Sequence, residues 1–322
     1  MSMEFVRSVV DGEMQAVDHL IRARLHSEVP LASQIGEYII AGGGKRLRPM
    51  MVLLAARALG YQGDKHHELA AMIELIHTST LLHDDVVDES SLRRGRDTAN
   101  ALFGNAASVL VGDFLYTRAF QMMVSANSMR IMEVMADATN IIAEGEVLQL
   151  MNIGNVDIDE AGYLKVIRFK TAKLFEAATR IGAILNSADP QTEAALSRYG
   201  MHLGTAFQII DDVLDYSGEQ AEIGKSLGDD LAEGKPTLPL IYLMRQGNAE
   251  TAELVRDALQ NANRDRFPAI AAAVANSPAL DYARQIARSE ANQAQSCLES
   301  LPDSPYRQAL HLLAEIALGR KS

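Results

Sequence analysis

One acidic pentad occurs twice in this chain, each time at the end of an apolar stretch. Residues 84–88 read Asp-Asp-Val-Val-Asp, and residues 211–215 read Asp-Asp-Val-Leu-Asp. On a helix, residues four apart lie on one face, so the first and last aspartates of each pentad lie side by side. A solvated acidic helix end is the ordinary alternative, but surface charge seldom continues into an apolar face as it does before Asp84. The chain must therefore fold so that two helices each present paired carboxylates in apolar surroundings.

Paired carboxylates repel each other, and their pKa values rise unless a cation compensates the charge. Magnesium takes oxygen ligands and commonly binds through one or two carboxylates together with phosphate oxygens of a substrate. Arg93 and Arg94 follow the first pentad directly and are suited to hold phosphate oxygens. We therefore expect a magnesium-dependent enzyme that acts on diphosphates. Its expected metal ligands are Asp84, Asp85, Asp88, Asp211, Asp212 and Asp215.

The rest of the chain indicates an all-α fold. Helix-forming residues dominate, strand-like alternation is scarce, and the prolines lie near expected helix boundaries. We expect a helical bundle around a central active-site cavity, with loops at 42–49 and 217–239. Its long helices are expected near residues 5–27, 66–89, 107–125, 129–152, 159–186 and 191–216. No fixed-period repeat or low-complexity linker divides the chain, so one domain over residues 1–322 is predicted.

Charge and cysteine content exclude several other classes of protein. Acidic residues outnumber basic ones by 42 to 30, for a net charge of −12, whereas a nucleic-acid binder usually shows the reverse. Cys297 is the one cysteine, so a disulfide framework is excluded. The first residues lack the basic start and apolar run of a signal peptide, and no run is long enough to cross a bilayer. We expect a cytoplasmic protein that contacts a membrane surface only transiently, when an apolar product leaves.

The motifs together resemble the trans-isoprenyl diphosphate synthase family, over most of the chain from about residue 35 to 239. The resemblance rests on Gly-Gly-Gly-Lys-Arg-Leu-Arg-Pro at 42–49, the two pentads, Arg-Arg-Gly at 93–95, Phe-Lys-Thr-Ala at 169–172, Phe-Gln-Ile-Ile at 207–210, and Gly-Lys at 224–225 and 234–235. Within the family, residues 105–114 and 142–151 are similar to the bacterial octaprenyl diphosphate synthases. The resemblance implies an isoprenoid-synthase-type helical bundle with prenyltransferase activity.

The resemblance also implies a role for each matching residue. Both pentads hold magnesium, three ions per site, which bind the allylic diphosphate. Asp84, Asp88 and Asp211 are the foremost ligands, and Asp85, Asp212 and Asp215 support them. The allylic diphosphate is further contacted by Arg93, Lys170, Gln208, Lys225 and Lys235. Isopentenyl diphosphate is bound by Lys45, Arg48, His77 and Arg94. Thr171 lies at a helix break that turns oxygen atoms toward the developing cation, so the expected catalytic residues are Lys170, Thr171 and Gln208. Such enzymes are usually homodimers, and the apolar helix 106–123 is the expected contact.

The length of the product depends on how far an apolar tunnel continues below the first pentad. Ser79 and Thr80, one turn before Asp84, are small, whereas a bulky aromatic near these positions stops elongation in short-chain relatives. Each further helical turn of about 5 Å adds about one isoprene unit of depth. Met123 and Met135 are the expected tunnel floor, although ordinary core packing is the commoner role of such methionines. We expect farnesyl diphosphate as primer and octaprenyl diphosphate, for a quinone side chain, as product.

Several alternatives remain open at this point. The product could be nonaprenyl or shorter, or the chain could be a non-catalytic subunit of a heteromeric synthase, although its motifs are intact. A terpene cyclase shares the first pentad, but its second metal motif usually mixes Asn, Ser or Thr with Glu. A di-iron bundle protein needs two Glu-x-x-His units, and the sequence has one, at 74–77.

Overall fold

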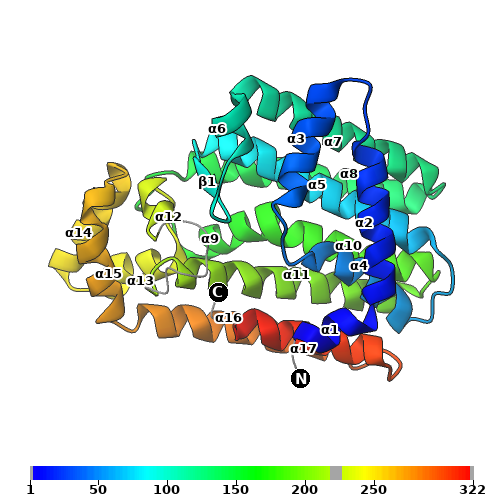
Figure 1. Ribbon diagram of the computed structural model, residues 1–322. Coiled ribbons are helices and arrows are strands. Elements are labelled where there is room, and N and C mark those ends of the chain that lie inside the picture. Colours follow the sequence, from blue (N-terminus) through cyan, green and yellow to red (C-terminus); the bar gives the residue numbers. More distant parts are fainter. Residues whose placement is uncertain (1–2, 218–226, 320–322) are drawn as a thin grey trace. The chain divides into compact units, whose positions relative to one another are not determined.

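The computed structural model describes residues 3–217 and 227–319, and it confirms the all-α prediction (Figure 1). The helices are α1 (Met3–Val9), α2 (Asp11–Leu25), α3 (Pro30–Ala41), α4 (Leu47–Ala58), α5 (Lys65–Val87), α6 (Ala99–Phe103), α7 (Asn105–Ser125), α8 (Met129–Met151), α9 (Glu160–Ile167), α10 (Lys173–Leu185), α11 (Pro190–Leu214), α12 (Asp229–Ala232), α13 (Leu238–Gln246), α14 (Ala249–Gln260), α15 (Phe267–Ala275), α16 (Ala279–Ser296) and α17 (Pro305–Leu318). A π-helical turn covers Arg168–Ala172, a 3-10 turn covers Arg264–Arg266, and β1 (Leu92–Arg93) pairs antiparallel with β2 (Arg96–Asp97).

The chain forms two compact units, and neither is a continuous stretch of sequence. The first consists of Met1–Asp137, Leu174–Gly200 and Cys297–Leu313, and the second of Ala138–Lys173, Met201–Ser296 and Ala314–Ser322. Each unit is therefore built from segments far apart in the chain, with α8 and α11 contributing residues to both. The single domain expected over residues 1–322 stays a prediction.

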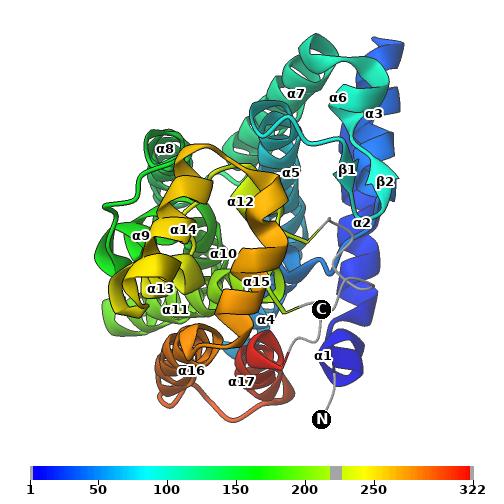
Figure 2. The same ribbon diagram turned by 90° about the vertical axis from the view of Figure 1, so that its left-hand side faces the viewer.

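The first unit is organised around α5. This helix is buried on every side from Leu69 to Ile76, as expected for a helix at the centre of a bundle, and it packs against α2, α4 and α7. α4 is almost entirely buried as well. Gly182 of α10 permits a close approach here, because a Cβ atom at this position would lie 2.6 Å from the Cβ of Ala55. After α5 the chain forms the β1–β2 hairpin and returns as α6 (Figure 2).

The second unit has its own apolar core. Ile209, Val213 and Leu240 are among its fully buried members, and α12 to α16 pack around them (Figure 2). α9 begins at Asp159, whose carboxylate caps the helix by accepting from Gly162 N at 2.8 Å. The π-helical turn follows α9 directly. Gly145 of α8 lies against that turn, because a Cβ there would be 2.5 Å from Lys170 N.

The observed helices differ from the expected ones mainly where the backbone bends. The helix predicted at 5–27 is interrupted at Val10, whose ψ of 17° breaks it into α1 and α2. The helix predicted at 159–186 contains the π-helical turn that separates α9 from α10. The loop predicted at 42–49 ends earlier, because α4 already begins at Leu47. Among the described residues, no helix is both long and apolar enough to span a membrane.

Candidate active site

The first pentad occupies the C-terminal end of α5, and its second aspartate, Asp85, forms an ion pair with an arginine. Asp85 is fully buried, and Arg93 of β1 donates to both of its oxygens, with Nε 2.8 Å and Nη2 2.6 Å from Oδ1 and Nε 3.1 Å from Oδ2. This bidentate pairing raises the pKa of Arg93 and fixes the hairpin against the helix end. Asp85 therefore positions Arg93 in this structure.

Asp84 and Asp88 have a different environment from Asp85. Both are partly exposed, and Asp88 N donates to Asp84 O at 2.8 Å as α5 ends. Because they are one helical turn apart, their carboxylates start from the same face of α5. The helix thus separates the pentad into a buried aspartate that binds an arginine and two aspartates accessible to a ligand.

A cluster of cationic side chains lies beside this helix end. Arg48 Nη1 is 3.1 Å from His77 Nε2, and the Arg48 guanidinium stacks 4.5 Å above the centre of the Phe175 ring. Burial and the charges of Arg48, Arg94 and then Arg93 lower the pKa of His77 well below its ordinary value. His77 is therefore neutral at physiological pH, and the arginines provide the positive charge.

The glycine-rich loop and the hairpin come together in the same cluster. Gly44, with φ of 146°, lies so close to Arg94 that a Cβ would be 2.8 Å from its Nη1. Lys45 follows directly and is exposed. Burial and the neighbouring Arg93 lower the pKa of Arg94, as expected for like charges held together without a bound anion. The structure therefore brings together Arg48, His77 and Arg94, and it places Lys45 directly after Gly44 in the adjoining loop.

In the second pentad the second aspartate, Asp212, also accepts hydrogen bonds from neighbouring side chains. Asp212, 4% exposed at the end of α11, accepts from Tyr163 OH at 2.6 Å and from Gln208 Nε2 at 2.8 Å. Burial, with the nearby charge of Asp230 second, raises the pKa of Asp212 well above its ordinary value. Tyr163 and Gln208 thus fix Asp212 as Arg93 fixes Asp85.

Asp215 and Asp211 complete the second pentad. Asp211 is exposed, whereas Asp215 is buried and accepts from Gly228 N at 3.1 Å through Oδ1. Its other oxygen, Oδ2, is buried without a hydrogen-bond partner among the described residues. Burial and the charge of Asp230 raise the pKa of Asp215 to about 8. A buried, unsatisfied carboxylate oxygen among other carboxylates is the donor set that suits Mg²⁺.

The π-helical turn presents the residues expected to be catalytic. Lys170 Nζ lies 2.7 Å from Gln149 Oε1 and 2.6 Å from Glu146 Oε2 of α8. Thr171 Oγ1 donates to Gln208 Oε1 at 3.1 Å, so Gln208 connects Thr171 to Asp212. The helix break expected at Thr171 is therefore present as a π-helical turn, a feature frequent at functional sites.

The remaining predicted residues have varied surroundings. Lys235 pairs with Glu233, while Lys225 lies outside the described residues. Met123 of α7 and Met135 of α8 are fully buried. Ser79 donates to Gly112 O of α7 at 2.8 Å, so its hydroxyl belongs to the α5–α7 contact, whereas Thr80 is partly exposed on the face of Asp84. The roles of these residues in setting chain length stay predictions.

Sequence reasoning gave no place in the candidate site to four neighbours of its residues, namely Tyr163, Asp230, and also Glu146 and Gln149, which it expected to form buried polar pairs or a subunit interface. Glu146 and Gln149 are three apart on α8, a spacing that could have shown that they share a face. Asp230 lies within the segment 217–239 expected to be a loop, where the pair Asp229 and Asp230 could have indicated a further acidic element. For Tyr163 the sequence offers no signal, because its partner Asp212 is 49 residues away.

Comparisons of the sequence and of the structure with known proteins identify one family. The sequence profile of the family described as polyprenyl synthetase matches residues 29–275. The chain is 53% identical to an octaprenyl diphosphate synthase of Escherichia coli over 321 residues, covering 99% of both chains, and 45% identical to an all-trans-nonaprenyl-diphosphate synthase of Rhodobacter capsulatus, again covering 99% of both. A crystal structure of a polyprenyl synthase from Caulobacter crescentus, complexed with calcium and isoprenyl diphosphate, superposes with a TM-score of 0.97 at 43% identity, covering 100% of this chain and 98% of the other. The resemblance drawn from the motifs is confirmed, and the chain belongs to the polyprenyl synthetase family.

Proposed function

We propose that this chain is a long-chain trans-polyprenyl diphosphate synthase that adds isopentenyl diphosphate units head to tail to an allylic diphosphate, with octaprenyl diphosphate as product. The observation that carries the proposal is the 53% identity to an octaprenyl diphosphate synthase along 99% of both chains. Shorter-chain relatives are more distant, for example a short chain isoprenyl diphosphate synthase at 33%. The 45% identity to a nonaprenyl synthase keeps nine units as the second candidate.

Magnesium ions are the proposed cofactor, three per site, with Asp84, Asp88, Asp211 and Asp215 as direct ligands. Asp85 and Asp212 support them by holding Arg93 and Gln208 in place. The bound metal supplies Lewis-acid neutralisation of the charge that builds on the departing diphosphate. Calcium in the crystal structure of the Caulobacter relative supports a divalent cation.

The cationic cluster of the first unit is the proposed binding site for isopentenyl diphosphate. Arg48 and Arg94 provide planar guanidinium groups suited to bidentate contact with phosphate oxygens, and Lys45 provides a mobile point charge. His77 stays neutral beside Arg48 and acts as a hydrogen-bonding group. The mutual repulsion of the arginines is relieved when the anion binds.

The allylic diphosphate is the proposed partner of Arg93, Lys170, Gln208, Lys225 and Lys235. When its C–O bond breaks, positive charge develops on the allylic carbons. The oxygens of Thr171 in the π-helical turn and of Gln208 on α11 are the proposed dipoles that face this charge, and fixed dipoles stabilise such charge without reorganising. The double bond of isopentenyl diphosphate attacks, and the proton it loses passes to the released diphosphate.

The surroundings of the reaction follow from the product. We propose farnesyl diphosphate as the primer, and a quinone side chain as the use of the product. We also propose that the enzyme is cytoplasmic and contacts a membrane surface transiently to release the product. A homodimer is the proposed assembly. Val109, Leu110 and Val124 of α7 support it, because they are large apolar side chains that are 37%, 67% and 66% exposed in the single chain.

The decisive experiment is to incubate the purified protein with farnesyl diphosphate, labelled isopentenyl diphosphate and magnesium, and to identify the products by mass spectrometry. A dominant product of about forty carbons with the diphosphate retained is expected. A cyclised hydrocarbon would identify a terpene cyclase. The absence of any magnesium-dependent product would support the alternative that the chain is a non-catalytic subunit.

Tyr163 is expected to matter for turnover although it need not touch substrate. Tyr163→Phe removes the hydroxyl that donates to Asp212 at 2.6 Å and leaves a buried carboxylate oxygen without that partner. A hydrogen bond to a charged group is worth about 1.5–3 kcal/mol, so we expect kcat to fall by about ten- to a hundredfold. The magnesium concentration for half-maximal rate is expected to rise in the same variant.

Tyr282→Phe is the matched control for this variant. Tyr282 also donates to a carboxylate, Glu160 Oε2 at 2.5 Å, but that pair is not in contact with the pentad. The control is expected to keep normal kcat and normal magnesium dependence. Equal losses in Tyr163→Phe and Tyr282→Phe would mean that the phenol only stabilises the fold.

A further inference from the structure

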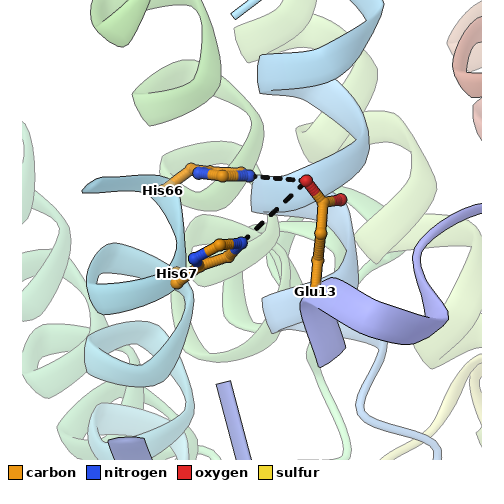
Figure 3. Close-up of side chains that lie close together, drawn as sticks. All are labelled: Glu13, His66 and His67. Carbon is orange, nitrogen blue, oxygen red and sulfur yellow. Dashed lines mark hydrogen bonds and ion pairs between the residues drawn. The ribbon is translucent and has the colours of Figure 1, made fainter. Parts of the chain in front are cut away.

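A cluster of metal-ligating side chains lies in the first unit, outside the residues discussed so far. It consists of Glu13 from α2 and of His66 and His67 from the first turn of α5 (Figure 3). His66 Nε2 is 2.9 Å and His67 Nε2 is 3.9 Å from Glu13 Oε1, and the ring centroids are 4.1 Å apart. All three ligand atoms lie within 4.8 Å of one another.

These separations suit one small cation. Zinc lies about 2.1 Å from imidazole nitrogen and carboxylate oxygen, so two of its ligand atoms can be at most about 4.2 Å apart. The two measured nitrogen-to-oxygen distances already fall below that limit. Figure 3 shows both rings presenting their Nε2 atoms to the same carboxylate oxygen.

The cluster also contains buried polar atoms that no neighbouring residue described by the structure satisfies with a hydrogen bond. His66 is fully buried, and His67 and Glu13 are mostly buried. Glu13 Oε2, His66 Nδ1 and His67 Nε2 are buried without a hydrogen-bond partner within the described part of the chain. Such unsatisfied buried atoms are rare in folded proteins, and each calls for an explanation such as an ion or a water molecule.

Arg57 is the charged group that faces the cluster from α4. Its Nε donates to Glu13 Oε1 at 2.5 Å, and its Nη1 donates to Tyr61 O. A carboxylate has about four lone-pair sites, so Glu13 can accept from Arg57 and still ligate a metal. Carboxylate ligands of metals are commonly held by such an outer hydrogen bond. The positive charge of Arg57 weakens the electrostatic attraction of the cluster for any cation. The choice of ion then depends on which metal prefers imidazole and carboxylate ligands.

We propose that Glu13, His66 and His67 form a binding site for a transition-metal ion of the Zn²⁺ type, separate from the magnesium chemistry of the pentads. Imidazole nitrogen suits Zn²⁺, Co²⁺ and Ni²⁺, whereas Mg²⁺ prefers oxygen ligands. Three protein ligands leave a fourth position for water. An open surface cavity of about 470 Å³, bordered by Glu13, Arg57 and Tyr306, gives the ion a route to the carboxylate.

The bound ion joins α2 to the start of α5. α2 and α5 pack against each other, and the only charged contacts that Glu13 makes among the described residues are those to Arg57, His66 and His67. A ligand that binds the folded state alone stabilises it by mass action. A bound ion would therefore fasten the N-terminal helices to the central helix.

Cobalt binding to the full-length protein in excess Mg²⁺ tests the proposal, because Mg²⁺ then fills the all-oxygen sites. We expect one equivalent of Co²⁺ per chain, with a visible ligand-field band typical of nitrogen ligation, and a rise in Tm on addition of Zn²⁺. Glu13→Gln and His67→Ala are expected to weaken Co²⁺ binding by more than about tenfold and to abolish the Zn²⁺-dependent rise in Tm. Circular dichroism checks that both variants fold.

His202→Ala is the matched control. His202 Nδ1 lies 2.6 Å from Glu290 Oε2, and Arg168 pairs with the same carboxylate at 2.8 Å, so this cluster resembles the proposed site but has one imidazole. The control is expected to keep the band and its affinity. No Co²⁺ band in the wild-type protein, or a band unchanged in Glu13→Gln and His67→Ala, would mean that the cluster is a charged hydrogen-bond network alone.

Discussion

Asp84→Ala is expected to reduce kcat by about a thousandfold while the protein stays folded. The carboxylate is a proposed direct ligand of the magnesium that neutralises the departing diphosphate. Charge stabilisation by a metal is worth several kcal/mol, and about 4 kcal/mol corresponds to about a thousandfold in rate. Steady-state rates with saturating primer and a magnesium titration measure the effect.

Little change in stability is expected in this variant, for a reason visible in α5. Asp84 is partly exposed, and its removal relieves repulsion from the other carboxylates but also removes its attraction for Arg93, so the two effects oppose each other. Asp85→Ala should behave differently. Its loss leaves the buried Arg93 guanidinium without its bidentate partner, and breaking a buried pair in this way costs about 3–5 kcal/mol.

The two variants therefore separate metal binding from folding. Asp84→Ala should have a Tm close to that of the wild type, whereas Asp85→Ala should melt at a clearly lower temperature. Asp281→Ala removes an 87%-exposed carboxylate and serves as the control that should change neither. Near-normal kcat in Asp84→Ala at limiting magnesium would refute the metal role of the first pentad.

The helices could be predicted from the sequence because each carries its own signals. Pro30 and Pro239 begin α3 and α13 within their first turn, and the long helices contain few residues that oppose helix formation. The break at Val10 could not be predicted, and the turn at 168–172 could be expected only as the helix break at Thr171 that the family resemblance implies. Both occur among residues with adequate helix propensity, so contacts elsewhere in the fold determine them.

The candidate site also has some features that local sequence patterns predict and others that depend on contacts elsewhere in the fold. The two pentads could be located from local patterns, since spacing along one helix fixes which side chains share a face. Thr171 is located only through the family resemblance. Spacing alone could not separate Asp84 from Asp85, because two adjacent aspartates are equivalent in a local pattern, and only the family resemblance makes Asp84 a foremost ligand and Asp85 a supporting one. Burial against Arg93 distinguishes Asp85, and that contact depends on the hairpin that follows α5.

The placement of Ser79 illustrates how a one-residue difference on a helix changes a side chain's surroundings. Ser79 and Thr80 are both small and adjacent, and the sequence assigns them the same role. Successive helical residues differ by about 100° in direction, so the two side chains face different neighbours. Ser79 donates to Gly112 O of α7, whereas Thr80 shares a face with Asp84. Of the two, Thr80 is the position at which product length should be altered.

Thr80→Phe is expected to shorten the dominant product to about fifteen or twenty carbons while initial condensation continues. The aromatic ring would occupy the apolar path one turn before Asp84, and one turn corresponds to about 5 Å, or about one isoprene unit. Product length, read by mass spectrometry after complete conversion of farnesyl or geranyl diphosphate, measures the change. Formation of octaprenyl diphosphate should be lost almost entirely.

Thr80→Val is the matched control, because it removes the hydroxyl bonded to His77 O but keeps the size of the side chain. Its product should remain at the wild-type length. Ser79→Phe is a less informative variant, since a ring there would meet α7 and lower stability by overpacking. If folded Thr80→Phe still makes the wild-type product, the elongating chain does not pass this face of α5. The tunnel then follows another helix, and the predicted floor at Met123 and Met135 loses its support.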